Sequence, residues 1–136
     1  MLVKGLDGSV STLNLKGGIS KGSAVNKSAL HLEARNLIKR LYPTMQILEE
    51  ITIYARKNEV MYMDFYIPLL KKCIEVHGEQ HYKFIPFYHN NVLSFVKAQK
   101  RDRDKKEWCY LNNIEYCELP YNKVHEWESI INHENC

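Results

Sequence analysis

Two acidic residues and a histidine of this chain are of types that could act together around a metal ion. Glu75 and His77 alternate at the end of a β-rich run, so a strand would direct both side chains to one face, just before Gly78. Asp64 lies inside the preceding β-rich run, where aspartate is depleted because it packs poorly on a pleated surface. If the two runs are neighbouring strands, the two carboxylates converge and need a positive partner. A hard divalent cation supplies it best, so we expect a Mg²⁺ site here.

Each acidic residue also has an ordinary structural explanation. Asp64 at a sheet edge or in a turn would be compensated by solvent, and an isolated glutamate at a strand end is more often a surface residue. Glu33 lies three residues after Leu30 and four before Leu37, so a helix would place it on or beside the apolar stripe. Considered alone, it is a border residue whose carboxylate reaches solvent. The combination, and not any single residue, favours a site.

The elements that would position these side chains follow from hydrophobic periodicity and from breaking residues. Helical spacing predicts helices over residues 28–42 and 91–111, and a short last helix that begins near Asn122. Runs of β-forming residues predict strands over residues 46–54, 60–67, 71–76 and 114–119, the first two forming a hairpin. The order α-β-β-β-α-β-α predicts an α/β (α+β) domain over residues 28–136, with a mixed sheet flanked by helices. Glycine-rich residues 1–27 predict a flexible leader with a short strand at residues 13–15.

Composition narrows the class of protein. A chain of 136 residues, 45% hydrophobic and 26% charged, is expected to form one globular domain. No apolar run approaches the roughly 18 residues that span a bilayer, and no signal peptide is evident, so we expect a cytoplasmic protein without a membrane partner. The four cysteines form no CxxC pair of the kind that binds zinc. The net charge of +3 permits nucleic-acid binding without requiring it.

The candidate residues resemble a known superfamily. Glu33 on a first helix, Asp64 on a second strand and Glu75-x-His77 on a third resemble the PD-(D/E)xK nucleases, with histidine in the usual lysine position. The spacing Asp64-x12-His77, followed by Gly-Glu-Gln-His81, is similar to the very-short-patch-repair endonuclease branch. The resemblance implies a restriction-endonuclease-like α-β-β-β-α-β core.

The same resemblance implies roles for individual residues. Asp64 and the carbonyl of Val76 would bind the metal directly, and Glu33 would bind it through water. His77 and His81 would be the acid and base. A second resemblance, to small nuclease-like proteins of phages and large viruses, extends over residues 28–121 and is carried by residues 74–83, 99–109, 112–116 and 119–121.

Basic residues concentrate in the expected second helix, where six of the ten residues 97–106 are Lys or Arg. A solvated helix face with i,i+4 ion pairs is the ordinary explanation of such a run. The resemblance favours contact with phosphates instead, and the aromatic loop before the helix could stack on bases or belong to the core. We assign DNA contact to Gln80, Lys83, Lys97, Lys100, Arg101, Arg103 and Lys105.

These observations predict a Mg²⁺-dependent DNA endonuclease that makes nicks or staggered breaks, with Mn²⁺ able to replace Mg²⁺. The predicted metal ligands are Asp64, Glu75 and Val76, and a homodimer would be needed to cut both strands symmetrically. Two alternatives remain: a non-catalytic nucleic-acid-binding module on the same fold, and a structural or interaction protein. Zinc bound through His77, His81 and His89 ranks below Mg²⁺, because carboxylates and carbonyls favour Mg²⁺ or Mn²⁺.

Overall fold

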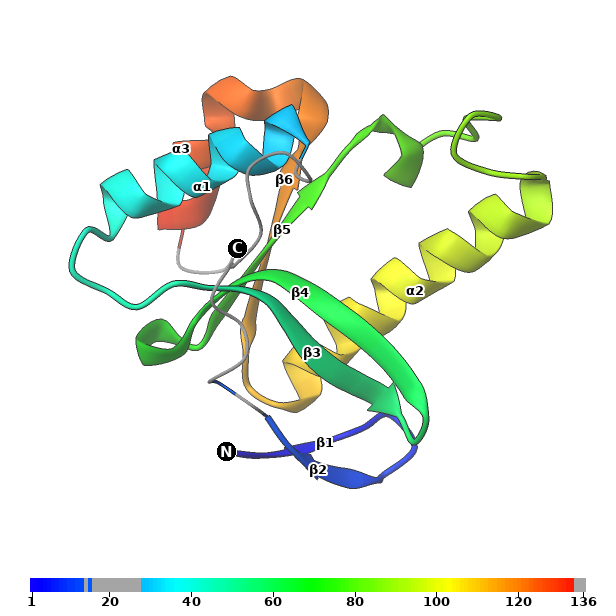
Figure 1. The fold of residues 1–136 in the computed structure, drawn as a ribbon, viewed down its shortest axis with the longest axis horizontal. Helices are drawn as coiled ribbons and strands as arrows, with labels where there is room; N and C mark the ends of the chain where they lie inside the picture. The colour runs from blue at the N-terminus through cyan, green and yellow to red at the C-terminus, as the bar shows by residue number, and fades with distance from the viewer. Residues whose placement is uncertain (14, 16–27, 134–136) are drawn as a thin grey trace.

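The computed structural model describes residues 1–13, 15 and 28–133 (Figure 1). Its main sheet has the strand order β3-β4-β5-β6. Strands β3 (Leu48–Arg56), β4 (Glu59–Ile67) and β5 (Lys72–His77) are antiparallel, and β6 (Glu115–Pro120) runs parallel to β5. The connection from β5 to β6 contains helix α2 (Val92–Leu111), the kind of crossover that a parallel pair requires. The predicted mixed sheet and its helices are confirmed at this level.

Helices cover both faces of the sheet, and each face has its own core. Helices α1 (Ala29–Leu41) and α3 (Trp127–Asn132) pack on one face, where the buried residues include Ala34, Ile38, Phe65, Ile74, Leu119 and Trp127. Helix α2 packs on the other face with its C-terminal half, where the buried residues include Met63, Cys73, Trp108, Cys109 and Tyr116. We refer to these as the α1 face and the α2 face (Figure 1). No helix in the described part of the chain is long and apolar enough to cross a membrane.

Residues 1–13 differ from the expected flexible leader. They form an antiparallel hairpin of β1 (Leu2–Lys4) and β2 (Val10–Thr12), with Gly8 in its turn at a φ of 82°. Val3 and Leu13 are buried in the α2-face core. The side chain of Asn112 accepts a hydrogen bond from the Lys4 N–H and donates one to the Lys4 carbonyl. The glycines therefore serve a docked turn in this segment, and positions 14 and 16–27 of the expected leader lie outside the described residues.

Capping residues set the starts of the two long helices. The Ser28 side chain accepts a hydrogen bond from the His31 N–H, and the Asn91 side chain accepts one from the Ser94 N–H. Short 3-10 segments make up the remaining helical turns: η2 (Pro68–Leu70), η3 (Glu79–His81) and η4 (Tyr121–Glu126). Asn122 lies inside η4 and does not cap the last helix, which begins at Trp127 without a side-chain cap.

The hairpin of β3 and β4 changes faces halfway along. In β4, Met63 belongs to the α2-face core and Phe65 to the α1-face core. Residues two apart in a regular strand share a face, so the pleat is broken at Asp64, which lies between them. On β3, the neighbouring position is Glu50, whose φ of 54° is left-handed. The main sheet therefore bends at the position of Asp64, and the bend removes this side chain from the regular pleat.

Candidate active site

Asp64 and Glu75 meet where β4 and β5 separate. The paired backbone of β4 and β5 ends at Phe65 and Ile74. Beyond that pair, the carboxylates of Asp64 and Glu75 accept the backbone N–H groups that the opposite strand would otherwise bind. The Asp64 N–H donates to Glu75 Oε2 over 2.6 Å, and the Val76 N–H donates to Asp64 Oδ2 over 2.9 Å. The structure thus brings together the two carboxylates that the sequence predicted to converge.

Lys105 of α2 reaches this carboxylate pair. Its Nζ lies 2.5 Å from Glu75 Oε1, and the two side chains are only 13% and 3% exposed. Burial and the charge of Asp64 raise the pKa of Glu75 to about 8 in spite of Lys105. Burial acts to lower the pKa of Lys105, but the attraction of Glu75 outweighs it and raises that pKa. A carboxyl group that ionises only with difficulty beside a second carboxylate is typical of functional sites.

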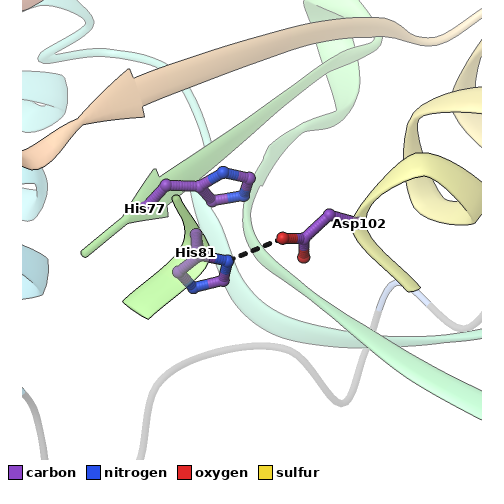
Figure 2. A group of neighbouring side chains, drawn as sticks. All are labelled: His77, His81 and Asp102. Carbon is purple, nitrogen blue, oxygen red and sulfur yellow. Dashed lines mark hydrogen bonds and ion pairs between the residues drawn. The ribbon is translucent and has the colours of Figure 1, made fainter. Parts of the chain in front are cut away.

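His77, His81 and Asp102 form a second group (Figure 2). The two imidazole rings are stacked, with centroids 4.1 Å apart and planes within 5°. His81 Nδ1 lies 2.8 Å from Asp102 Oδ2. Burial acts to raise the pKa of Asp102, but the hydrogen bond from His81 and the charges of His81, His77 and Lys105 together outweigh it and lower that pKa. An ionised Asp102 accepts a proton-bearing Nδ1, which leaves Nε2 of His81 as the nitrogen with a free lone pair.

Both groups lie on the α2 face of the sheet. In β5, Cys73 belongs to the α2-face core and Ile74 to the α1-face core, so alternation directs Glu75 and His77 toward α2. A cleft of about 710 Å³ between β4 and α2 is lined by Tyr62, His81, Ala98, Arg101, Asp102 and Lys105, among others. Asp102 and Lys105 are three residues apart on α2, so one helix face presents both to the cleft.

Glu33 does not join these residues. It is exposed on α1 and lines a separate pocket of about 390 Å³ together with Arg40, His125 and Glu128. Helix α1 covers the α1 face, whereas Glu75 and His77 project from the α2 face. Apolar spacing located this helix correctly, but it does not show which face of the sheet the helix covers.

Sequence reasoning missed Asp102 and misassigned the position of Lys105. Both belong to the charge run of α2, where most neighbours are solvated, and nothing local distinguishes them. Lys105 was expected to contact DNA and instead pairs with Glu75. The signal that could have identified Asp102 and Lys105 is their spacing of three residues, which places both side chains on one face of a helix.

The other residues of α2 that were predicted to contact DNA lie on two different sides of the helix. Lys97, Lys100 and Arg101 line a shallow pocket of about 190 Å³ with Met61, and Arg101 also lines the larger cleft. Lys100 pairs with Asp104 at 3.2 Å. Arg103 is exposed and lines neither cavity. Two residues correspond to about 200° around a helix, so Arg103 points away from the side on which Arg101 lies.

The predicted DNA contacts before α2 are separated from this cleft. Lys83 is exposed and lies 3.7 Å from Glu79. Gln80 is partly buried and lines another pocket with Val76, Tyr88 and Tyr121, among others. The structure therefore places Lys83 on an open surface and Gln80 beside the carboxyl end of β5.

The oxygen atoms around Asp64 fit a hard cation. Asp64 Oδ2 accepts from Val76, and Oδ1 has no hydrogen-bond partner in the part of the chain that the structure describes. In an extended strand the N–H and the carbonyl of one residue point to the same edge, so the Val76 carbonyl is directed to the Asp64 side. Asp64, Glu75 and Val76 are thus a donor set of the type that Mg²⁺ or Mn²⁺ prefers.

The structure separates His89 from the other two candidate zinc ligands. His89 Nδ1 lies 3.0 Å from the Ile85 nitrogen and 3.1 Å from the Ile85 oxygen, and its ring packs against Phe84 and Phe95. The group of close metal-binding side chains in the described residues contains His77, His81 and Asp102. His89 therefore holds its own loop in place.

No protein-family model and no solved structure matches the chain. The chain is similar to "Uncharacterized protein 307L" of Invertebrate iridescent virus 6, with 46% identity over 71 residues, 52% of this chain and 36% of that protein. It is also similar to "Uncharacterized protein 033L" of Invertebrate iridescent virus 3, with 34% identity over 59 residues, 43% of this chain and 30% of that protein. The chain thus spans about a third of the length of these two viral relatives, whose names state no activity.

Proposed function

We propose that this protein is a metal-dependent nuclease that hydrolyses phosphodiester bonds in DNA. The observation that carries the proposal is the convergence of Asp64, Glu75 and Lys105 beside the hydrogen-bonded pair of His81 and Asp102. Hydrolysis of a phosphodiester needs an activated water, compensation of charge on the phosphate and a proton for the leaving oxygen. The residues around this cleft are of the types that supply all three.

Mg²⁺, replaceable by Mn²⁺, is the cation that we propose for the carboxylate pair. Asp64, Glu75 and the Val76 carbonyl would hold it, and it would supply positive charge for the phosphate and a more acidic water. Lys105 offers a second positive charge from α2 at the same place. Lys97, Lys100 and Arg101, which line the adjoining pocket, would contact backbone phosphates and fix the position of the DNA.

His81 is the residue that we assign to proton transfer. Asp102 holds its Nδ1–H and would stabilise the imidazolium that forms when Nε2 accepts a proton. Burial and the neighbouring His81 lower the pKa of His77, so His77 is neutral at pH 7 and supports His81 by stacking. This assignment gives the two histidines different roles because, among the described residues, a carboxylate lies within 3 Å of His81 and none lies that close to His77.

The proposal extends to the fold. The elements α1, β3, β4, β5, α2 and β6 follow the order of a restriction-endonuclease-like core. The position of Asp64 and Glu75 at the separation of two neighbouring strands supports a place in the PD-(D/E)xK superfamily, near its very-short-patch-repair branch. The exposed Glu33 departs from that pattern.

One observation favours a second candidate, a non-catalytic nucleic-acid-binding module. Lys105 already places a positive charge beside Glu75 without any metal, as it would in a site that no longer binds one. The two candidates share the basic surface of α2, and they differ in whether the carboxylate pair takes up a cation and supports cleavage.

DNA cleavage by the full chain in Mg²⁺, Mn²⁺ or EDTA separates the two candidates. A nuclease should cut in either metal and not in EDTA, and Asp64→Asn should reduce the rate by orders of magnitude while DNA affinity is kept. Glu33→Gln is the matched control, because it also removes one carboxylate but on the opposite face, and it should cut at the wild-type rate. Binding without cleavage in every metal would support the binding module, and full activity in EDTA would contradict metal dependence.

A further inference from the structure

His77, His81 and Asp102 form a ligand set distinct from the carboxylate pair. They come from the end of β5, from η3 and from α2, and one ligand atom of each lies within 4.8 Å of the others (Figure 2). Asp64 and Glu75 are not members of this group. The α2 face therefore carries an oxygen-only donor set and, beside it, a set with two nitrogens and one carboxylate.

Within the part of the chain that the structure describes, His77 makes no short hydrogen bond although it is only 3% exposed. Its Nε2 lies 3.4 Å from the Tyr116 hydroxyl, and its Nδ1 lies 3.4 Å from Glu118 Oε1. Both distances exceed the usual range of about 2.7–3.2 Å. Glu118 Oε2 accepts instead from the Tyr82 hydroxyl. Buried polar groups are normally well paired, so this imidazole has the capacity to bind a further group.

We infer that His77, His81 and Asp102 bind a transition-metal ion such as Zn²⁺. Two imidazoles and a carboxylate suit Zn²⁺ and its first-row neighbours, whereas Mg²⁺ prefers oxygen ligands throughout. Three protein ligands leave a coordination position open, and the cleft that His81 and Asp102 line gives access to it. The site would thus be open to small ligands from solution.

Binding requires a local rearrangement of His81. The parallel stack directs the lone pairs of the two rings side by side and not toward one point. The His81 side chain is 28% exposed and lies in the three-residue segment η3, so it has room to turn. Asp102 would exchange its hydrogen bond with His81 for a bond to the ion. The well-held ligand is then His77, and His81 is the one that moves.

The inference has a regulatory consequence that rests on the proposed function. If His81 transfers a proton, an ion bound to its ring removes the free lone pair from the reaction. Zn²⁺ should therefore inhibit cleavage that Mg²⁺ supports, and inhibition should be reversed by a zinc chelator.

Titration of Zn²⁺ alone into the metal-free full chain, followed by calorimetry, tests the site directly. We expect one ion per chain, with His81→Ala and Asp102→Asn each weakening its affinity by about 10-fold or more. Glu33→Gln and His125→Ala are controls, since they remove a carboxylate and an exposed histidine that line the separate pocket of the α1 face; both should bind as wild type. Absorption of bound Co²⁺ should report the same losses, and circular dichroism should show that each variant is folded.

The outcomes distinguish this inference from the nuclease proposal. Zn²⁺ binding that His81→Ala and Asp102→Asn leave unchanged would overturn the site even if the protein cleaves DNA. Zn²⁺ binding that both variants weaken would uphold the site even if no DNA is cut. If the protein cleaves DNA and binds Zn²⁺ at this cluster without inhibition, the role of His81 in proton transfer is overturned while the metal site stands.

Discussion

Two buried glutamates, on opposite faces of the sheet, each form an ion pair with a basic residue of a helix, but their charges are compensated to different degrees. On the α1 face, Glu49 of β3 accepts hydrogen bonds through both oxygens from Arg35 of α1, at 2.9 to 3.1 Å. On the α2 face, Glu75 of β5 has one cation, Lys105, and a second carboxylate, Asp64, beside it. The first cluster is balanced in charge, and the second carries an excess of negative charge.

The pKa shifts of the two glutamates go in opposite directions. Burial acts to raise the pKa of Glu49, but hydrogen bonds from Arg35 and His31 outweigh it and lower that pKa. Burial raises the pKa of Glu75 to about 8, and Asp64 adds to the increase. The difference teaches that burial of a carboxylate does not by itself indicate function. Incomplete compensation of its charge is the more informative sign.

The largest difference between the clusters should appear when each loses its cation. Arg35→Met leaves Glu49 buried with its charge poorly compensated, and should lower the free energy of unfolding by about 3 kcal/mol or more. Lys105→Met should cost about 1 kcal/mol or less, because Glu75 takes up a proton readily when its pKa is near 8. Urea unfolding at pH 7 in EDTA measures both. Equal losses would remove the distinction between the two clusters.

The pH dependence of stability should separate the two glutamates by sign. The folded pKa of Glu49 is below its usual 4.5, so its contribution is present above that value and is lost as the pH falls through the folded pKa. The folded pKa of Glu75 is above 4.5, so stability declines as the pH rises from about 4.5 to about 8.

Replacement of each glutamate by glutamine tests these two limbs. Glu49→Gln should remove the loss of stability on the acid side. Glu75→Gln should remove the decline on the alkaline side, so the free energy of unfolding of this variant should rise relative to that of the wild type as the pH increases from about 4.5 to about 8. Both are measured by thermal unfolding in EDTA across pH 3 to about 9. If both variants changed the pH dependence of stability in the same pH range, the opposite pKa shifts of the two glutamates would be contradicted.

The smallest expected effects are those of single surface cations on DNA affinity. Lys97→Ala and Arg101→Ala, which alter the side of α2 that lines the pocket with Met61, should each reduce the slope of log affinity against log salt by about 0.9 if the residue contacts one phosphate. Arg103→Ala, on the other side of the same helix, and Arg40→Ala, on α1, should leave the slope unchanged. Fluorescence anisotropy with duplex DNA at several salt concentrations measures it. If all four variants kept the wild-type slope, the DNA would not contact Lys97 or Arg101 and would bind another surface.

Local sequence patterns predicted most of the fold. Ser28 caps the first long helix as expected from its side chain, the second long helix begins near Asn91 as expected, and the hairpin of β3 and β4 follows from β-rich runs on either side of a polar turn. The convergence of Asp64 and Glu75 was also predictable. Asp64 lies inside an apolar strand, where it needs a partner, and Glu75 lies on the strand expected to be its antiparallel neighbour.

The remaining features depend on long-range geometry. Glu50 takes a left-handed backbone conformation within a strand, and nothing in the Glu-Glu pair at 49–50 indicates the change of faces. Glu49 therefore resembles an ordinary exposed strand residue, although it is buried. Asp102 and Lys105 reach the site only because α2 crosses the end of β5, and the charge pattern of a helix does not specify that crossing. Glu33 was placed at the site by the family resemblance, whereas its helical spacing alone indicated a border residue that reaches solvent, and the structure shows it exposed on α1.

The hairpin of β1 and β2 has a consequence for the order in which the chain folds. Its anchors lie far along the sequence: Asp7 accepts from the Lys57 N–H, 50 residues away, and Lys4 bonds with Asn112, 108 residues away. An isolated two-stranded hairpin is at most marginally stable, and distant contacts form late because closing a long loop costs chain entropy. These strands are therefore synthesised before their partners but become fixed after them. Until then, the core cluster of Trp108 lacks Val3 and Leu13, and the apolar surface that they later cover is open to aggregation.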